Sequence, residues 1–135
     1  MTESQTFAWI LLSVPDSPGT LQDIIAMADA INHAIPTQHE LQTSLGWLQA
    51  RGLVRKDGRR FCTTDAGAQL INHLRRPRQT MMKMWDLVAA KLEPLRGEPA
   101  APENVTLEEC ASAYNSYKKA FWKAYGELEK KEREI

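Results

Sequence analysis

Four basic side chains lie within six residues of the sequence, and their density is suited to binding an anion. Arg55 and Lys56 stand just before an Asp-Gly pair, and Arg59 and Arg60 follow it. Such side chains can neutralise phosphates, and each phosphate contact steepens the salt dependence of binding by roughly 0.9 in a log–log plot. The cluster therefore indicates contact with a polyanion. The alternative is that charges at a strand tip keep the molecule soluble and protect a sheet edge.

The charges of the chain are segregated, although its 135 residues sum to a net charge of zero. Residues 1–50 contain five acidic side chains and no Lys or Arg, whereas residues 51–78 contain eight basic and two acidic side chains. Local fields govern an encounter with a polyanion, because salt screens charges beyond about 10 Å. Arg75, Arg76 and Arg78 either extend the basic patch or stabilise the carboxyl end of a helix.

A polar helix face precedes the basic cluster and has side chains that could read bases. Its outward side is expected to present Gln38, His39, Gln42, Thr43, Gly46, Gln49 and Ala50. Glutamine can pair with adenine, and threonine can touch a thymine methyl group. No Lys or Arg occurs before Arg51, so a solvated polar face is the alternative. The predicted DNA-binding residues are Gln38, His39, Gln42, Thr43, Arg51, Arg55, Lys56, Arg59 and Arg60.

Residues for enzyme chemistry are scattered, so we expect neither an enzyme nor a cofactor or metal site. The three histidines lie far apart, and neither a nucleophile with a neighbouring base nor a Gly-rich phosphate loop is evident. Cys62 and Cys110 lack metal-type spacing and are interpreted as reduced thiols. The apolar run from Ala8 to Leu12 is too short for a signal peptide, which predicts a cytoplasmic protein without a membrane partner.

The elements that would position these side chains lie between Thr37 and Leu70. Thr37 and Glu40 have capping-box spacing, and Gly52 stands where a glycine commonly ends a helix. The helix between them has an apolar stripe of Leu41, Leu45 and Leu48. Residues 53–56 and 59–62 flank Asp57-Gly58, which predicts a hairpin with these two residues as its turn.

Two stretches of this region resemble bacterial winged helix-turn-helix regulators of the MarR and PadR type. Leu45-x-x-Leu48-x-x-x-Gly52-Leu53-Val54 resembles the end of their recognition helix and their first wing strand. Phe61-x-Thr63-Thr64-x-x-Gly67-x-x-Leu70 resembles their second wing strand and the following helix, with Thr63 where leucine is common. The resemblance covers about half the chain. It implies a transcription regulator that binds double-stranded DNA, with helix 37–51 in the major groove and the hairpin as a wing.

Further helices are expected on both sides of this region. Residues 5–13 and 20–31 have apolar residues at helical spacing, separated by a break at 15–19. After the hairpin we expect helices over 65–74 and 78–93. Residues 94–102 are typical of a linker, and a second capping box at Thr106–Glu109 starts a long helix towards Arg133.

Apolar and aromatic residues after the hairpin predict a homodimer. The last helix has a seam with alternating steps of three and four, which is typical of a coiled coil. Core packing within one chain, or a pocket for a small-molecule effector, would use the same kinds of side chain. The predicted dimerisation residues are Met81, Trp85, Tyr114, Tyr117, Phe121, Tyr125 and Leu128.

The sequence thus predicts a mainly α-helical protein with a small β-hairpin wing. Residues 1–76 would form a winged-helix DNA-binding domain, and residues 77–135 a helical dimerisation region. The alternative is a winged-helix interaction module that does not bind DNA, which the acidic first fifty residues and the base-free helix favour. In that case the helix face around Trp47 would be covered by a partner or by the C-terminal helix of the same chain.

Overall fold

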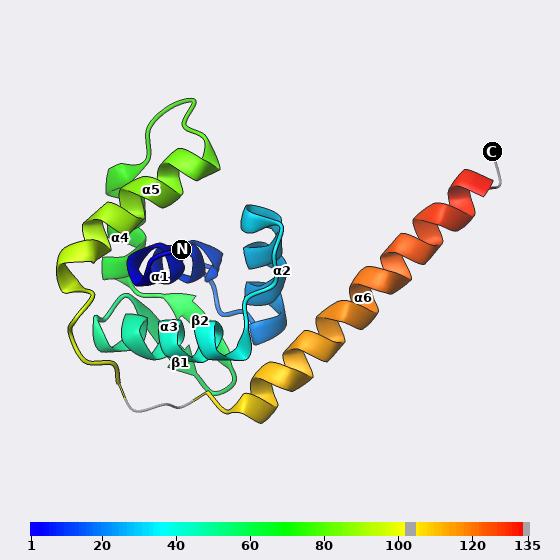
Figure 1. Cartoon of the computed structure of the whole chain (residues 1–135), viewed down its shortest axis with the longest axis horizontal. Helices are drawn as coiled ribbons and strands as arrows, with labels where there is room; N and C mark the ends of the chain where they lie inside the picture. The colour runs from blue at the N-terminus through cyan, green and yellow to red at the C-terminus, as the bar shows by residue number, and fades with distance from the viewer. Residues whose placement is uncertain (102–104, 134–135) are drawn as a thin grey trace.

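The computed structural model describes residues 1–101 and 105–133. Pro102, in the predicted linker, and residues 134–135, in the charged end, lie outside the described residues. The chain is mainly helical with one small antiparallel hairpin, as the sequence predicts (Figure 1). The elements are α1 (Glu3–Ser13), α2 (Leu21–Asn32), α3 (Gln38–Ala50), β1 (Val54–Asp57), β2 (Arg60–Thr63), α4 (Asp65–Leu74), α5 (Met81–Leu92), the 3-10 turn η1 (Glu93–Leu95) and α6 (Leu107–Arg133).

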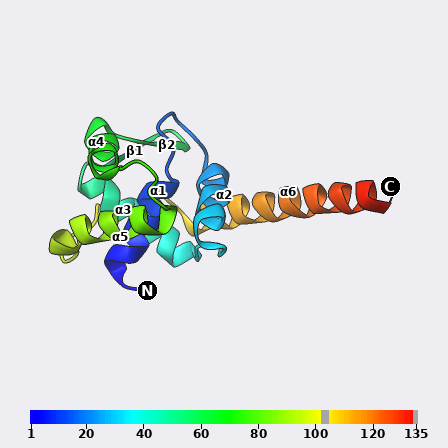
Figure 2. The same cartoon turned by 90° about the horizontal axis from the view of Figure 1, so that it is seen from above.

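Helix α1 lies at the centre of the molecule, and α2, α3 and α5 pack around it (Figures 1 and 2). The indole nitrogen of Trp9 donates to the carbonyl of Ala28 on α2 at 2.9 Å. Phe7 stacks on Trp47 of α3, with 4.3 Å between ring centroids and 7° between ring planes. Both contacts satisfy or bury large aromatic groups, so they fix α2 and α3 against α1.

Helix α5 belongs to the same hydrophobic core. Trp85 is 6% exposed, and its indole nitrogen donates to the carbonyl of Gln5 on α1 at 2.7 Å. The Trp85 ring also lies 6.2 Å from that of Trp9. The core therefore continues across residue 76, where the sequence indicated a boundary between two regions. Trp85, predicted to contact a second chain, packs inside the core of its own chain.

Helix α3 begins and ends where its sequence predicts. The Thr37 hydroxyl accepts from the Glu40 amide, and the Glu40 carboxylate accepts from the Thr37 amide, both at 3.0 Å. Gly52 has φ of 70°, a conformation that costs little for glycine, and the helix ends before it. A cap of this kind is worth about 1 kcal/mol.

The hairpin turn lies one residue later than predicted. Asp57 pairs with Arg60, so Gly58 and Arg59 are the central residues of the turn. Gly58 has φ of 63°, and Arg59 does not have positive φ. Positive φ at the first central position alone is the pattern of a II′ turn, whose first residue is usually glycine. Asp57 therefore ends β1, and Arg59 lies at the tip.

A third extended segment joins the hairpin from the stretch that the sequence indicated only as a break. Gly19 and Phe61 exchange two backbone hydrogen bonds, at 2.9 and 2.8 Å. The amide of Thr63 also donates to the carbonyl of Pro15 at 3.0 Å. These bonds hold β2 between β1 and the connection from α1 to α2, so the hairpin is anchored to the helical body.

Helix α6 has 27 residues and is therefore about 40 Å long. Its first turns pack on α2 and α3, and its second half projects alone from the body (Figures 1 and 2). Four large apolar side chains of the projecting half are exposed: Phe121, Trp122, Tyr125 and Leu128. In the described part of the chain, no helix is both long and apolar enough to cross a membrane.

Gly67 provides a test of the packing between the hairpin and α4. A Cβ atom added there would lie 2.1 Å from the carbonyl oxygen of Leu53, which is backbone and cannot rotate away. We expect Gly67→Ala to lower the free energy of unfolding by about 1–3 kcal/mol, as overpacking usually does. Gly97→Ala, where an added Cβ meets nothing within 4 Å, should change it by less than about 0.5 kcal/mol. Urea unfolding of both variants measures the difference, and equal stabilities would contradict the tight contact.

Candidate nucleic-acid interface

The hairpin tip presents three exposed arginines, Arg55, Arg59 and Arg60. Within the part of the chain that the structure describes, none of the three forms an ion pair with a carboxylate. Arg55 Nε donates to the Cys62 sulfur at 3.0 Å, and Cys62 raises the pKa of Arg55 above its ordinary value. The three guanidinium groups are therefore accessible to an external anion.

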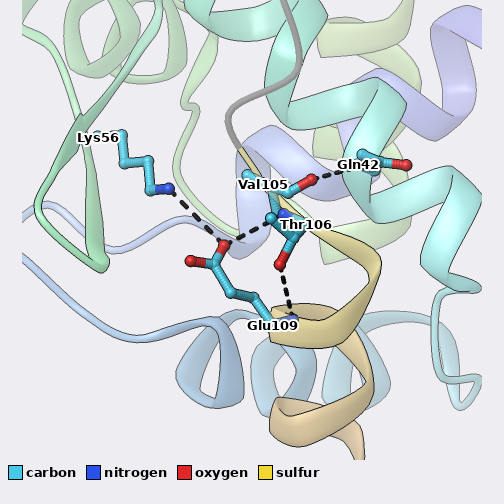
Figure 3. Close-up of polar contacts among 5 residues, drawn as sticks. All are labelled: Gln42, Lys56, Val105, Thr106 and Glu109. Carbon is cyan, nitrogen blue, oxygen red and sulfur yellow. Dashed lines mark hydrogen bonds and ion pairs between the residues drawn. The ribbon is translucent and has the colours of Figure 1, made fainter.

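Lys56, the fourth base of the cluster, is held by the chain itself. Its Nζ lies 3.7 Å from Glu109 Oε2 of α6, and the two side chains are 14% and 32% exposed (Figure 3). The same ammonium group lies 5.8 Å from the centre of the Phe61 ring. An ion pair that is partly shielded from water is screened less by salt than a fully exposed one.

The carboxylate of Glu109 joins two elements that are distant in sequence. Its Oε2 also accepts from the Thr106 amide at 3.2 Å, while the Glu109 amide donates to the Thr106 hydroxyl at 3.0 Å (Figure 3). The predicted capping box at the start of α6 is thereby confirmed. One oxygen atom thus both caps α6 and pairs with β1.

The outward face of α3 is crossed by the chain that precedes α6. At the end of the helix, Arg51 Nη2 donates to the Pro99 carbonyl at 3.0 Å. About one turn earlier in α3, the Gly46 carbonyl accepts from the Ala101 amide at 3.2 Å. Near the start of the helix, Gln42 Nε2 donates to the Val105 carbonyl at 2.6 Å. These contacts follow α3 from its end towards its beginning, so the covering chain runs antiparallel to it.

This cover changes the expected exposure of the base-reading side chains. Gly46, placed on the outward side by the sequence, is buried, and Gln42 and Thr43 are only partly exposed. Gln38 and His39, in the first turn, are exposed. In this arrangement α3 cannot lie in a major groove along its length, because residues 99–101 and 105 occupy the face that would enter it.

The covered region leaves several polar atoms without a partner. Among the described residues, Ser44 Oγ, Trp47 Nε1 and Arg51 Nη1 are buried and accept or donate no hydrogen bond. Ser44 and Trp47 line an open pocket of about 340 Å³ that Arg96, Glu98 and Ala100 also border. Trp47 itself packs between Phe7 and the Arg51 guanidinium, 5.5 Å from its ring. A buried polar group without a partner costs about 1–3 kcal/mol.

The remaining predicted residues divide between the chain's own packing and solvent. Tyr117 donates to Asp29 of α2 at 2.5 Å, and Tyr114 is half-buried beside α2 and α3. Met81, Phe121, Tyr125 and Leu128 are exposed, and their role in dimerisation stays a prediction. Arg76 donates to the His73 carbonyl at 2.8 Å, so it stabilises the carboxyl end of α4. No group of three or more His, Cys, Asp or Glu among the described residues could hold a metal ion.

The contact between Lys56 and Glu109 was missed by the sequence analysis. The capping-box spacing identified Glu109 as a cap, but no sequence pattern relates it to a strand in another part of the chain. The segregation of charge was the available signal, because a basic patch in a chain of zero net charge needs acids elsewhere.

Tyr117 tests the docking of α6 on α2. Burial, and then its hydrogen bond to Asp29, raise the pKa of Tyr117 to about 12. The folded protein keeps a proton that an unfolded tyrosine loses near pH 10, so this contribution to stability is lost as pH rises from 10 to 12. In an absorbance titration of phenolate, Tyr117→Phe should remove a step near pH 12 that Tyr125→Phe retains. A step near 12 in Tyr117→Phe would contradict the docking.

A comparison of the chain with models of known families, with curated proteins and with solved structures finds no match. Two features of the chain itself bear on its function: three exposed arginines around a tight hairpin, and a polar helix whose outer face is covered by the segment before α6.

Proposed function

We propose that this protein is a winged-helix DNA-binding regulator that contacts duplex DNA chiefly through the phosphate backbone. The order of α1, a bridged extended segment, α2, α3 and a hairpin is that of a winged helix, and it supports this proposal. The observation that carries it is the exposure of Arg55, Arg59 and Arg60 at the hairpin tip, in the one strongly basic stretch of the chain.

The arrangement of the arginines favours phosphate contact over base reading. Arg59 lies in the turn, and Arg55 and Arg60 lie on the two strands beside it. Because the strands are fixed to the body through Gly19 and Phe61, their charges approach a duplex as a unit. Backbone contacts of this kind position a protein but carry no sequence information directly. Binding through them should therefore be sensitive to salt and tolerant of sequence.

The proposed role of the hairpin is tested by replacing two of its arginines. Arg59→Ala with Arg60→Ala should weaken binding to any duplex and reduce the log–log salt slope by about 1.8, since each phosphate contact contributes roughly 0.9. The matched control is Lys130→Ala with Lys131→Ala, which removes the same charge from the projecting end of α6. Fluorescence anisotropy with a random-sequence duplex at several salt concentrations measures both. An unchanged slope in the hairpin variant rules the phosphate role out.

In this proposal two copies of the chain pair through the projecting half of α6. Phe121, Trp122, Tyr125 and Leu128 are exposed there, and Trp122 is 60% exposed. Burial of an aromatic side chain is strongly favourable, so a cluster of them on one helix favours association. A dimer would present two hairpins to a duplex.

Dimerisation is tested by placing charges in this cluster. Tyr125→Lys with Leu128→Lys should convert a dimer to a monomer in sedimentation equilibrium, because it buries like charges at the contact. Met82→Lys, at an exposed apolar position on α5, serves as the control and should leave the association unchanged. A wild-type protein that sediments as a monomer at high micromolar concentration would contradict this pairing.

The cover on α3 favours a second candidate function, a winged-helix interaction module that does not bind DNA. Selection of bound fragments from random duplex DNA, at near-physiological salt and again at low salt, separates the two candidates. Retention of duplex by the wild-type protein, with loss in the hairpin variant, supports DNA binding. Absence of retention at low salt supports the interaction module.

A further inference from the structure

We infer that the chain has an internal cover over α3, and that this cover opens when a polyanion bound at the hairpin breaks the ion pair between Lys56 and Glu109. The cover consists of residues 96–101 and 105–109. This inference rests on the proposed DNA binding. It assigns control over base reading to the C-terminal part of the chain.

The cover occupies the face of α3 that base reading would need. Its contacts with Arg51, Gly46 and Gln42 are spread over the length of the helix, from the residue that follows its last turn towards the first turn. The amide of Gln42, a candidate for pairing with adenine, is already used on the Val105 carbonyl. Opening would release this side chain and expose the backbone around Gly46.

The closed state is built from contacts that are individually weak. Polar atoms of Ser44, Trp47 and Arg51 have no partner in it, whereas solvent could satisfy those that opening exposes. The pocket of about 340 Å³ beside Ser44 and Trp47 shows that cover and helix do not pack tightly there. A closed state with such defects can be displaced by a modest change in free energy.

The ion pair between Lys56 and Glu109 couples the cover to the hairpin. Lys56 and Arg55 point to opposite faces of β1, because side chains alternate along a strand. Arg59 at the hairpin turn, however, lines the same open pocket as Phe61 and Glu109. A phosphate held by Arg59 therefore lies on the side of the hairpin where Lys56 pairs with Glu109. That phosphate attracts Lys56 and repels the Glu109 carboxylate. Because Glu109 also caps α6, its displacement loosens the start of that helix and the Val105 contact just before it. DNA therefore binds the open state better than the closed one, which is the requirement for a ligand to shift the equilibrium.

Hydrogen exchange of the full-length protein tests the coupling without any operator sequence. Glu109→Gln removes the charge but keeps a side chain that can complete a capping box. It should speed amide exchange over 105–110 by up to about fivefold, since a partly exposed ion pair is worth a factor of that order. Glu108→Gln makes the same charge change at the adjacent, exposed position and should have no such effect. Equal exchange in the two variants overturns the role of the ion pair.

Addition of a random-sequence duplex to the wild-type protein should produce the same acceleration. If anisotropy shows that the duplex binds but amide exchange over 97–101 and 105–110 is unchanged or slower, the opening of the cover is overturned and the proposed DNA binding stands. Failure of the duplex to bind at low salt instead counts against the proposed function, and Glu109→Gln still tests the closure by itself.

A disulfide lock tests whether opening is needed for base reading. An ideal Cβ on Gly46 lies 4.0 Å from Ala100 Cβ, within the range for a disulfide. Gly46→Cys with Ala100→Cys, once oxidised, should bind random duplex with the wild-type salt slope but enrich no motif from a random pool. Reduction should restore the motif that the wild-type protein selects. The native thiols Cys62 and Cys110 are buried, and oxidised wild-type protein controls for them. Enrichment of the same motif by the oxidised variant, or of none by the wild type, overturns control of base reading by the cover.

Discussion

The burial of α1 is the constraint on which the remaining structure depends. Trp9 bonds α1 to α2, Phe7 stacks it on Trp47 of α3, and Trp85 of α5 bonds to it from a third side. The indole donors of Trp9 and Trp85 each bond to a backbone carbonyl, and the Trp47 ring is held by stacking on Phe7, so each of these contacts fixes an orientation as well as a distance. Once α1 is surrounded in this way, the face of α5 that contains Trp85 is buried within the chain, and the position of α3 is set by its inner face.

This packing determines what is left for the outer face of α3. The stack on Phe7 buries Trp47, which is 2% exposed. The accessible side of α3 then has few basic side chains and many small or amide side chains. The Ala101 amide donates to the Gly46 carbonyl, and a Cβ added at Gly46 would lie 3.5 Å from the Ala101 carbonyl oxygen, an ordinary contact. A helix face with these residues is suited to packing against extended chain, and without a lysine or arginine it has little attraction of its own for phosphate.

The local elements could be predicted from the sequence, because caps and turns act over a few residues. The capping boxes at Thr37 and Thr106 and the helix end at Gly52 are examples, and the hairpin was found with its turn displaced by one residue. That displacement could not be foreseen, since Asp-Gly supports two registers and the bridge from Gly19 to Phe61 selects one of them. The exposed arginines of the candidate site were likewise visible as a charge cluster. A cover on α3 was raised only as part of the alternative, with a partner or the C-terminal helix as its source. That residues 99–101 and 105 provide it could not be predicted, because it depends on contacts between segments far apart in the chain, which no period or spacing encodes.

Glu109 connects the segregated charges of the chain, because its carboxylate pairs with Lys56 of the basic hairpin. The basic hairpin of a protein with zero net charge faces two competing anions, its own carboxylate on α6 and any external phosphate. Salt weakens both interactions, but the internal one is partly shielded and fixed by the capping box, so it is the less sensitive of the two. When the reading-competent state is only a fraction of the population, the apparent dissociation constant rises by the inverse of that fraction. The three arginines that have no carboxylate partner within the described chain would then supply the free energy for the first contact with DNA, and reading by α3 would follow only where the additional contacts exceed the cost of opening.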